Sequence, residues 1–183
     1  MAPSPPVVIW FTGLPCSGKT TLSIAVDQQL TAAGWPILRL DGDDLRRGIN
    51  SDLGFSAADR QENVRRTAEI ARLVCGNGIN CIVALVSPIE ADREMARSII
   101  GANRFFEIYL STPLQICESR DVKGMYQRAR SGELPQFTGV SAPYERPKNP
   151  SLTIDTGSIS IRSAAAKKPQ NLLKLSLISQ KTS

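Results

Sequence analysis

Residues 13–21 have the sequence GLPCSGKTT and match the pattern G-x-x-x-x-G-K-[ST] of phosphate-binding loops. The two fixed glycines let the backbone approach phosphate groups, and the loop amides and the following helix N-terminus offer them partial positive charge. We expect Lys19 to reach the β- and γ-phosphates and the Thr20 hydroxyl to ligate Mg²⁺. The spacing therefore predicts that a nucleoside triphosphate binds to Gly13, Leu14, Pro15, Cys16, Ser17, Gly18, Lys19, Thr20 and Thr21.

Two carboxylates follow the next apolar segment, in the sequence LDGDD. Asp41 and Asp43 flank a glycine at the predicted carboxyl end of a strand, the edge at which open α/β sheets bind ligands. Near a bound triphosphate, one carboxylate can help to hold Mg²⁺ through water, and the other can take a proton from an acceptor hydroxyl. Asp-Gly sequences also favour turns, so a purely structural role is the alternative for this pair.

An anion site is predicted around the sequence GFSAADRQENVRR. An arginine fork suits a phosphate or a sulfate, which makes Arg46 and Arg60 candidates for binding one. Asn63 and Thr67 are expected to share a helix face with Arg60, opposite the apolar stripe of that helix. Phe55 offers a flat ring for stacking. A solvated, charged helix face is the alternative interpretation.

The absence of histidine limits the possible chemistry. A general base has to be Asp, Glu, Lys, Cys or Tyr, and hydrolases of the Ser-His-Asp and Cys-His types are excluded. The four cysteines have no C-x-x-C spacing, which favours neither a zinc site nor a disulfide framework. They are expected to be reduced and buried, with Cys16 in the loop as the candidate for an accessible thiol.

The rest of the sequence alternates apolar, β-branched segments with helical patterns. Strands are expected at residues 7–12, 36–41, 79–86, 104–110 and 152–155. Helices are expected at residues 19–33, between Ser56 and Gly76, at 89–101, from Pro113, and around residues 123–132. This order predicts an α/β protein with the three-layer P-loop NTPase fold, with a mostly parallel central sheet, helices on both faces and a lid segment.

The predicted helix after residue 56 has a clear beginning and a clear buried face. Ser56 is a candidate N-cap, and Asp59 three residues later approximates a capping box. One helical face carries the apolar stripe Val64, Ala68, Ala71 and Cys75.

Several longer stretches resemble the adenylylsulfate kinase (APS kinase) family. In chain order from Val7 to Thr156 they are LDGDDLR, DLGF, DRQENVRR, VSP, CESRDVKGMYQRARSGELPQFTG and YERP. The combination of RDVKG with FTG is the most specific of these similarities. Members of the family use MgATP to phosphorylate the 3′-hydroxyl of adenosine 5′-phosphosulfate, producing 3′-phosphoadenylyl sulfate. The resemblance therefore implies this activity, with ATP and Mg²⁺ as cofactors.

The resemblance also implies a role for each matching residue. Asp43 would be the base or, with Thr20, a metal-linked group, and Asp41 would support it. Arg128 and Arg130 would bind ATP and stabilise the transferring phosphoryl group. The adenine of the acceptor would stack on Phe55, with Phe137 on its other side. The acceptor site as a whole would consist of Asp41, Asp43, Arg46, Phe55, Arg60, Asn63, Ser87, Ile89, Lys123, Phe137, Thr138 and Gly139.

Ser87 corresponds to a serine of the family that is sometimes described as a phosphorylated intermediate. A P-loop kinase holds donor and acceptor in line and needs no covalent relay, so we expect direct transfer. Ser87 and Ile89 are then expected to contact the substrate. The sequence departs from the family at Pro15 and Cys16, which replace small residues, and at Asp44, where asparagine is usual.

The charge distribution separates the C-terminal segment from the rest. The net charge is +5, and residues 158–183 supply all of it, because they hold five Lys or Arg and no Asp or Glu. A balanced body argues against a nucleic-acid-binding face. We therefore divide the chain into an N-terminal extension (1–6), an APS-kinase-like domain (7–157) and a basic C-terminal segment (158–183) that can form a closing helix.

Localisation and partners are expected from composition and from the resemblance. No apolar run is long enough to span a membrane, and the N-terminus lacks the basic region of a secretory signal, which favours the cytoplasm. The family resemblance implies a homodimer and a functional link to ATP sulfurylase. Two alternatives remain open: a P-loop kinase for a sugar, a nucleoside or shikimate, and a regulatory domain that binds nucleotide without transfer.

Overall fold

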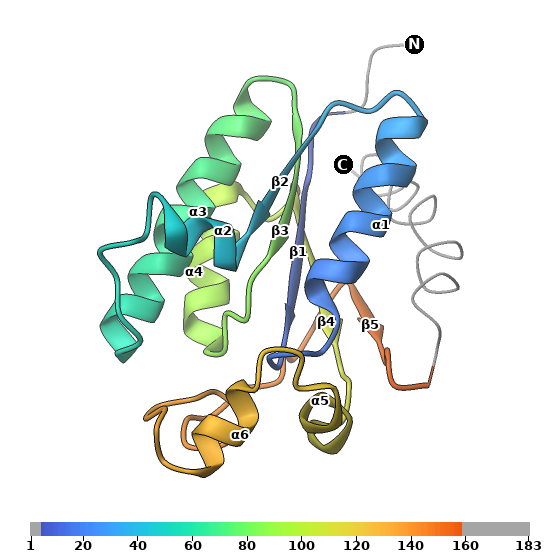
Figure 1. The fold of residues 1–183 in the computed structure, drawn as a ribbon. Coiled ribbons are helices and arrows are strands. Elements are labelled where there is room, and N and C mark those ends of the chain that lie inside the picture. Colours follow the sequence, from blue (N-terminus) through green and yellow to red (C-terminus); the bar gives the residue numbers. More distant parts are fainter. Residues whose placement is uncertain (1–4, 159–183) are drawn as a thin grey trace.

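The computed structural model describes residues 5–158 and shows a parallel sheet between two layers of helices (Figure 1). Five strands lie in the order β2-β3-β1-β4-β5, and every neighbouring pair is parallel. Helices α3 and α4 cover one face and α1 covers the other, while α5 and α6 lie beyond the carboxyl edge (Figure 1). This arrangement confirms the predicted three-layer fold, in which ligands bind at the carboxyl edge.

The strands and helices agree closely with the expected segments. The strands are β1 (Val8–Gly13), β2 (Ile37–Asp41), β3 (Asn80–Ala84), β4 (Phe105–Leu110) and β5 (Leu152–Ile154). The helices are α1 (Lys19–Ala32), α2 (Gly42–Arg47), α3 (Ala57–Gly76), α4 (Glu90–Ile100), α5 (Leu114–Arg120) and α6 (Met125–Arg130). None of these helices is long and apolar enough to cross a membrane.

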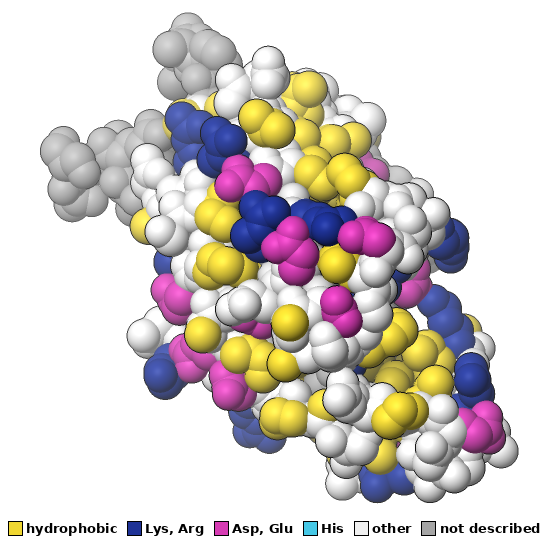
Figure 2. Space-filling view, turned by 90° about the vertical axis from the view of Figure 1, so that its left-hand side faces the viewer, with side chains coloured by type: hydrophobic (Ala, Val, Ile, Leu, Met, Phe, Trp, Pro, Cys, Tyr) yellow, Lys and Arg dark blue, Asp and Glu magenta, His cyan; other side chains and the backbone are white. Residues whose placement is uncertain are grey.

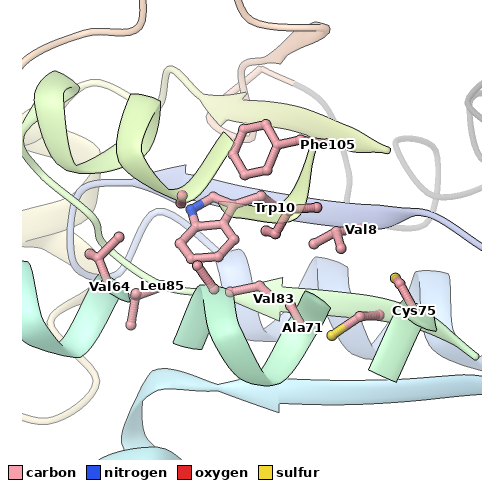
Figure 3. Packing of buried hydrophobic residues seen from close by; sticks show 12 residues of the cluster. Val8, Trp10, Val64, Ala71, Cys75, Val83, Leu85 and Phe105 are labelled. Carbon is pink, nitrogen blue, oxygen red and sulfur yellow. The ribbon is translucent and has the colours of Figure 1, made fainter. Parts of the chain in front are cut away.

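The central strand β1 is apolar on both sides because both faces of the sheet are covered. Successive side chains of a strand point to opposite faces. Trp10 therefore packs toward α3 and α4, at 5.6 Å between ring centroids from Phe105 (Figure 3). Ile9 and Phe11 pack on the opposite face, in a cluster with Leu22 and other side chains of α1. Complete burial of β1 fixes the position of the loop that follows it.

Helix α3 begins and packs as its sequence predicts. The Ser56 hydroxyl accepts a hydrogen bond from the Asp59 amide at 3.1 Å, which confirms the N-cap. The predicted stripe is buried, as its residues Val64, Ala68, Ala71 and Cys75 all lie in the core. The exposed side of α3 carries ion pairs, so acidic and basic side chains alternate on this face of the molecule (Figure 2).

One expectation about α3 is wrong. Asn63 and Thr67 were expected opposite the apolar stripe, yet both are buried, with exposed fractions of 4% and 0%. Both positions are close to the stripe in angle, because they directly precede Val64 and Ala68 in the sequence. Burial is tolerated because each polar group is bonded: Asn63 accepts from the Asn50 amide at 2.8 Å, and Thr67 donates to the Asn63 carbonyl at 2.6 Å.

Two further elements differ from the sequence expectations. The Asp-Gly sequence at residues 41–42 does not form an isolated turn but starts α2, whose N-cap Asp41 accepts from the Asp43 amide at 3.0 Å. The strand expected at 79–86 ends at Ala84, because the chain leaves the sheet before Ser87, which has a φ of 37°. Both differences lie where the carboxyl edge of the sheet is shaped for a ligand.

The segment beyond α5 forms a small cluster of its own over the sheet edge. Its buried members are Cys117, Tyr126, Ala129 and Phe137. Cys75, Cys81 and Cys117 are buried free thiols and Cys16 is partly exposed, as expected. The start of the predicted N-terminal extension and nearly all of the basic C-terminal segment, including its closing helix, lie outside the described residues.

Candidate active site

A cavity of about 570 Å³ lies at the carboxyl edge of the sheet. It brings together most of the predicted site residues, which are Pro15, Cys16, Gly18, Lys19, Thr20, Thr21, Asp41, Asp43, Arg46, Phe55, Arg60, Asn63, Ser87, Lys123, Phe137 and Thr138. We call the part formed by residues 15–21 and Arg120 the loop end. The part formed by Arg46, Phe55, Arg60, Ser87 and Thr138 is called the arginine end.

The backbone of the loop requires its two fixed glycines. Gly13 has a φ of 152°, and a Cβ atom there would lie 2.8 Å from the Leu110 carbonyl oxygen. Gly18 has a φ of 95° and is the N-cap of α1. Cys16 has a φ of 58°, an unusual conformation for a residue with a side chain. The predicted loop residues Gly13, Leu14 and Ser17 form the loop without lining the cavity.

Lys19 is folded back onto its own loop. Its ammonium group donates to the carbonyl oxygens of Gly13 at 3.0 Å and Leu14 at 2.7 Å. Burial lowers the pKa of Lys19 to about 8, because the charged form loses its hydration. A bound anion would favour the charged form and offer Lys19 an alternative partner.

The Thr20 hydroxyl donates to the Asp41 carboxylate at 2.8 Å. Asp41 is buried and also accepts from Arg39 at 3.3 Å. Mg²⁺ prefers oxygen ligands and is often held by one or two carboxylates together with substrate phosphates. Thr20 and Asp41 therefore fit a magnesium ion at the loop end, whereas the sequence prediction paired Thr20 with Asp43.

Asp43 lines the cavity and forms an ion pair with Lys123, which lines it as well. Both side chains are more than half exposed, so the pair is accessible to a ligand. Exposed pairs of this kind contribute about 0–1 kcal/mol to folding. The pair is therefore easily exchanged for contacts with a substrate.

At the arginine end, the Phe55 ring lies close to two guanidinium groups. The guanidinium carbons of Arg46 and Arg60 lie 4.4 and 5.6 Å from the centroid of the Phe55 ring. Arg60 also donates to Thr138 Oγ1 at 3.1 Å and to the Gln136 carbonyl at 2.6 Å. These contacts join α3 to the segment beyond α6 and place two guanidinium groups at one end of the cavity.

The predicted stacking partners are differently exposed. Phe55 is 53% exposed, whereas Phe137 is 7% exposed. The ring of Phe137 meets Tyr126 edge-on, with centroids 5.0 Å apart. The Phe55 ring is thus accessible to a ligand ring, whereas Phe137 is a buried part of the wall of the same cavity.

The Ser87 hydroxyl is already engaged inside the protein. It accepts from the Trp10 indole at 3.1 Å, and the residue is 2% exposed. Asn63 is likewise buried, with its side-chain oxygen bonded to Asn50. Both residues line the cavity, and the side-chain oxygen of each already has a partner inside the protein.

Four predicted residues lie away from the cavity lining. Arg128 pairs with Glu133 at 3.2 Å and Arg130 pairs with Glu118, so neither arginine reaches the loop end. Ile89 is the N-cap of α4. Gly139 packs against the Leu14 side chain behind the lining.

Arg120 is a cavity residue that the sequence prediction did not name. It donates to Thr156 Oγ1 at 3.0 Å, to the Thr156 carbonyl at 2.7 Å and to the Cys16 carbonyl at 3.4 Å. It therefore joins the loop to the segment after β5. Its signal was available, because it is the first residue of RDVKG.

A parallel sheet with this strand order, a phosphate-binding loop after its central strand and a covered cavity at the carboxyl edge define the class of P-loop kinases. The sequence pattern of the adenylylsulphate kinase family matches residues 5–155. The chain therefore belongs to the adenylylsulphate kinase family.

Individual relatives agree with this assignment. The adenylyl-sulfate kinase of Bacteroides thetaiotaomicron is 52% identical over 155 residues, which are 85% of this chain and 77% of the relative. That of Prochlorococcus marinus is 48% identical over 172 residues, 94% of this chain and 86% of the relative. The solved structure of a Mycobacterium tuberculosis APS kinase in complex with AMPPNP and APS has a TM-score of 0.86. It is 43% identical, with 94% of this chain and 98% of that chain covered.

Proposed function

We infer that this chain is an adenylylsulfate kinase, which transfers the γ-phosphoryl group of ATP to the 3′-hydroxyl of adenosine 5′-phosphosulfate. The observation that supports this most is one cavity that is lined both by the phosphate-binding loop and by two arginines close to an aromatic ring. The Mycobacterium tuberculosis relative, solved with AMPPNP and APS together, supports the same pairing of ligands. ATP would occupy the loop end and the nucleotide sulfate the arginine end.

At the loop end, we assign donor binding to the backbone amides of residues 13–20 other than Pro15, and to Lys19. Lys19 would leave the carbonyls of Gly13 and Leu14 and contact the β- and γ-phosphates. Thr20 and Asp41 would hold Mg²⁺, which supplies charge neutralisation for the phosphates. Arg120 is the guanidinium placed to contact the nucleotide from the lid, in place of Arg128 and Arg130.

At the arginine end, we assign acceptor binding to Arg46, Arg60 and Phe55. The guanidinium groups offer forked donors for the phosphosulfate anion, and the exposed ring of Phe55 offers a face for the adenine. Phe137 and Thr138 close this end from the lid. Lys123 would move from Asp43 to the anionic acceptor when the acceptor binds.

Transfer is proposed to be direct and in line. Asp43 lines the same cavity and would accept or steer the 3′-hydroxyl proton as the 3′-oxygen bonds to the γ-phosphorus and the bond between that phosphorus and ADP breaks. Ser87 is an unsuitable covalent relay because its hydroxyl is buried and bonded to Trp10. The lid around residues 120–150 would exclude water and so limit hydrolysis of ATP.

We further propose, from the family resemblance, that the protein acts in the cytoplasm as a homodimer and receives its acceptor from an ATP sulfurylase. These proposals concern the setting of the reaction rather than its chemistry. Sedimentation of the purified protein measures the oligomeric state directly.

The function is tested by ADP release from MgATP with adenosine 5′-phosphosulfate, with AMP and with no acceptor. AMP is the matched control because it lacks only the sulfate. We expect ADP to form at a high rate with the nucleotide sulfate alone, together with a product that is heavier by one phosphoryl group. Equal ADP release in all three reactions would contradict the proposal. Release with a sugar, a nucleoside or shikimate instead would indicate another small-molecule kinase.

A further inference from the structure

Arg93 is a buried cation of α4 that takes no part in the chemistry described above. It is 1% exposed and forms an ion pair with Glu107 of β4, with 2.8 Å between Nε and Oε1. Burial of Glu107 raises its pKa, because the ionised carboxylate loses its hydration there. Burying such a pair is costly, and replacing it with apolar groups is often neutral or stabilising. The buried Arg93–Glu107 pair is therefore better explained by a role in positioning than by a gain in folding stability.

The other donors of Arg93 reach two loops that are far apart in the sequence. One terminal nitrogen, NH1, donates to the Ser87 carbonyl at 2.8 Å. The second, NH2, donates to the Glu145 carbonyl at 2.8 Å. A single guanidinium group thus fixes β4, the loop after β3 and the segment before β5 relative to one another.

The loop that Arg93 holds is part of the cavity wall. Val86, Ser87 and Pro88 all line the cavity. Ser87 has a φ of 37°, a conformation that is unfavourable for a non-glycine residue and that surrounding contacts have to maintain. The hydrogen bond from Arg93 to the Ser87 carbonyl helps to maintain this backbone conformation.

Glu145 closes the same loop from the other side. Its amide donates to the Pro88 carbonyl at 2.8 Å, and its carboxylate accepts from the Glu90 amide at the start of α4 at 2.7 Å. The adjacent Tyr144 hydroxyl lies 2.9 Å from Thr12 Oγ1, which donates to the Val86 carbonyl at 2.7 Å. The backbone carbonyls of all three loop residues are therefore bonded within this network.

We propose that Arg93 and Glu145 are positioning residues for the acceptor, because they hold the loop Val86–Pro88 in the shape that the arginine end of the cavity requires. This inference rests on the proposed function of the site. It assigns the YERP sequence, through Tyr144 and Glu145, to the same task. The donor nucleotide is unaffected, because no loop-end residue is bonded to Arg93 or Glu145 within residues 5–158.

Arg97 provides a matched control for Arg93. It lies one turn further along α4 and pairs with the same Glu107 carboxylate at 3.4 Å. Its other described contacts are Glu94 and the Phe105 ring, and it does not reach the loop. Lysine at either position keeps the positive charge beside Glu107 but cannot make the forked contacts of arginine.

The test compares Arg93→Lys with Arg97→Lys in the full-length protein, by the KM values for adenosine 5′-phosphosulfate and for ATP. Loss of two hydrogen bonds to the loop is expected to raise the acceptor KM of Arg93→Lys about tenfold, with the ATP KM within about twofold of wild type. Arg97→Lys is expected to keep both constants. A role in folding alone would lower the melting temperature without separating the two KM values, and that result would overturn the proposal.

Glu145→Ala keeps the test decisive if Arg93→Lys does not fold. The Glu145 side chain is exposed, so its removal is compatible with folding, and it is expected to raise the acceptor KM about threefold through the lost contact with Glu90. An unchanged or equally shifted pair of KM values in this variant would overturn the inference. Wild-type protein separates the two hypotheses: acceptor-dependent ADP release in the wild type keeps the proposed function even where the positioning role fails.

Discussion

The loop end of the cavity comes from one continuous segment of chain, whereas the arginine end gathers side chains from segments far apart in the sequence. Most of the lining of the loop end comes from the stretch 15–21, while Arg120 bonds to Cys16 and Asp41 accepts from Thr20. The arginine end combines α2, α3, the loop after β3 and the lid through Arg46, Arg60, Ser87 and Thr138. The first end therefore depends on local backbone conformation, and the second depends on tertiary contacts.

This difference predicts different responses to substitution. Backbone amides persist when a side chain changes, so changes at the loop end should act mainly through Lys19, Thr20 and the two glycines. Changes at the arginine end should weaken acceptor binding and leave the donor unaffected.

Asp43→Ala is expected to give the largest effect. Removal of a group that accepts or steers a proton lowers kcat by about 10²–10⁴-fold, while affinity for an ATP analogue stays within a few-fold of wild type. Steady-state kinetics and calorimetry measure the two quantities.

Asp44→Ala is the matched control, because the Asp44 carboxylate pairs with Arg47 at 3.0 Å and does not line the cavity. It should keep kcat within about twofold, since exposed ion pairs contribute little. Near-wild-type turnover of Asp43→Ala would remove Asp43 from the mechanism.

Arg60→Lys is expected to raise the acceptor KM by about 10–100-fold, because a charged hydrogen bond to the anion and the fork toward Thr138 are lost. The ATP KM should change little, since Arg60 is at the other end of the cavity. Arg65→Lys is the control on the same helix, as Arg65 pairs with Glu62 on the exposed side. Equal shifts of the acceptor and ATP constants would contradict the separation of the two ends.

The pH dependence of donor binding is expected to depend on Lys19. Its pKa is about 8 in the free site, so below pH 8 the ammonium form already predominates and affinity for an ATP analogue is constant. Above pH 8 the neutral form of Lys19 predominates, and Lys19 has to take up a proton when the triphosphate binds. The Kd should therefore rise toward about tenfold per pH unit. Isothermal titration with AMPPNP between about pH 6.5 and 9.5 measures this slope.

Lys19→Arg sharpens that experiment. Arginine stays charged throughout this range, so the slope above pH 8 should disappear even where affinity is lower. A wild-type Kd that is flat to the highest pH would show that Lys19 is not the group that titrates.

Ser87→Ala is expected to give the smallest effect. Direct transfer does not need the hydroxyl, so kcat should fall by less than about threefold, with a modest loss of stability from the unpaired Trp10 indole. A fall of several hundredfold in kcat would support a phosphoryl-serine intermediate and contradict direct transfer.

The sequence was sufficient to predict those parts of the structure whose conformation depends on a short local pattern. The phosphate-binding loop, the buried central strand and the Ser56 cap of α3 follow from spacing and burial patterns, and the structure confirms each. The acidic pair at Asp41 and Asp43 was placed at the correct edge of the sheet. The roles assigned to the two carboxylates stay predictions, and the contact of Asp41 with Thr20 is visible only in the structure.

Other features depend on side-chain contacts that the sequence pattern does not show. Asn63 was expected opposite the apolar stripe of α3, but it is buried, where its side-chain oxygen accepts from Asn50. Arg128 and Arg130, which were expected at the phosphates, pair with Glu133 and Glu118 in the structure, and their role in ATP binding stays a prediction. Arg120 belongs to the RDVKG sequence that the resemblance included, but its contacts with Cys16 and Thr156, which lie far away in the sequence, are visible only in the structure. The hydrophobic periodicity of the sequence does not predict contacts between such distant side chains.

The most direct measurement follows the phosphoryl group itself. ATP labelled with ¹⁸O on its γ-phosphoryl group is mixed with adenosine 5′-phosphosulfate and the wild-type protein, and the product is analysed by mass spectrometry and phosphorus NMR. Transfer from the loop end to the arginine end predicts that the labelled group appears intact on the 3′-oxygen of the nucleotide sulfate. Label found only in inorganic phosphate would contradict the account, because the γ-phosphoryl group would then pass to water.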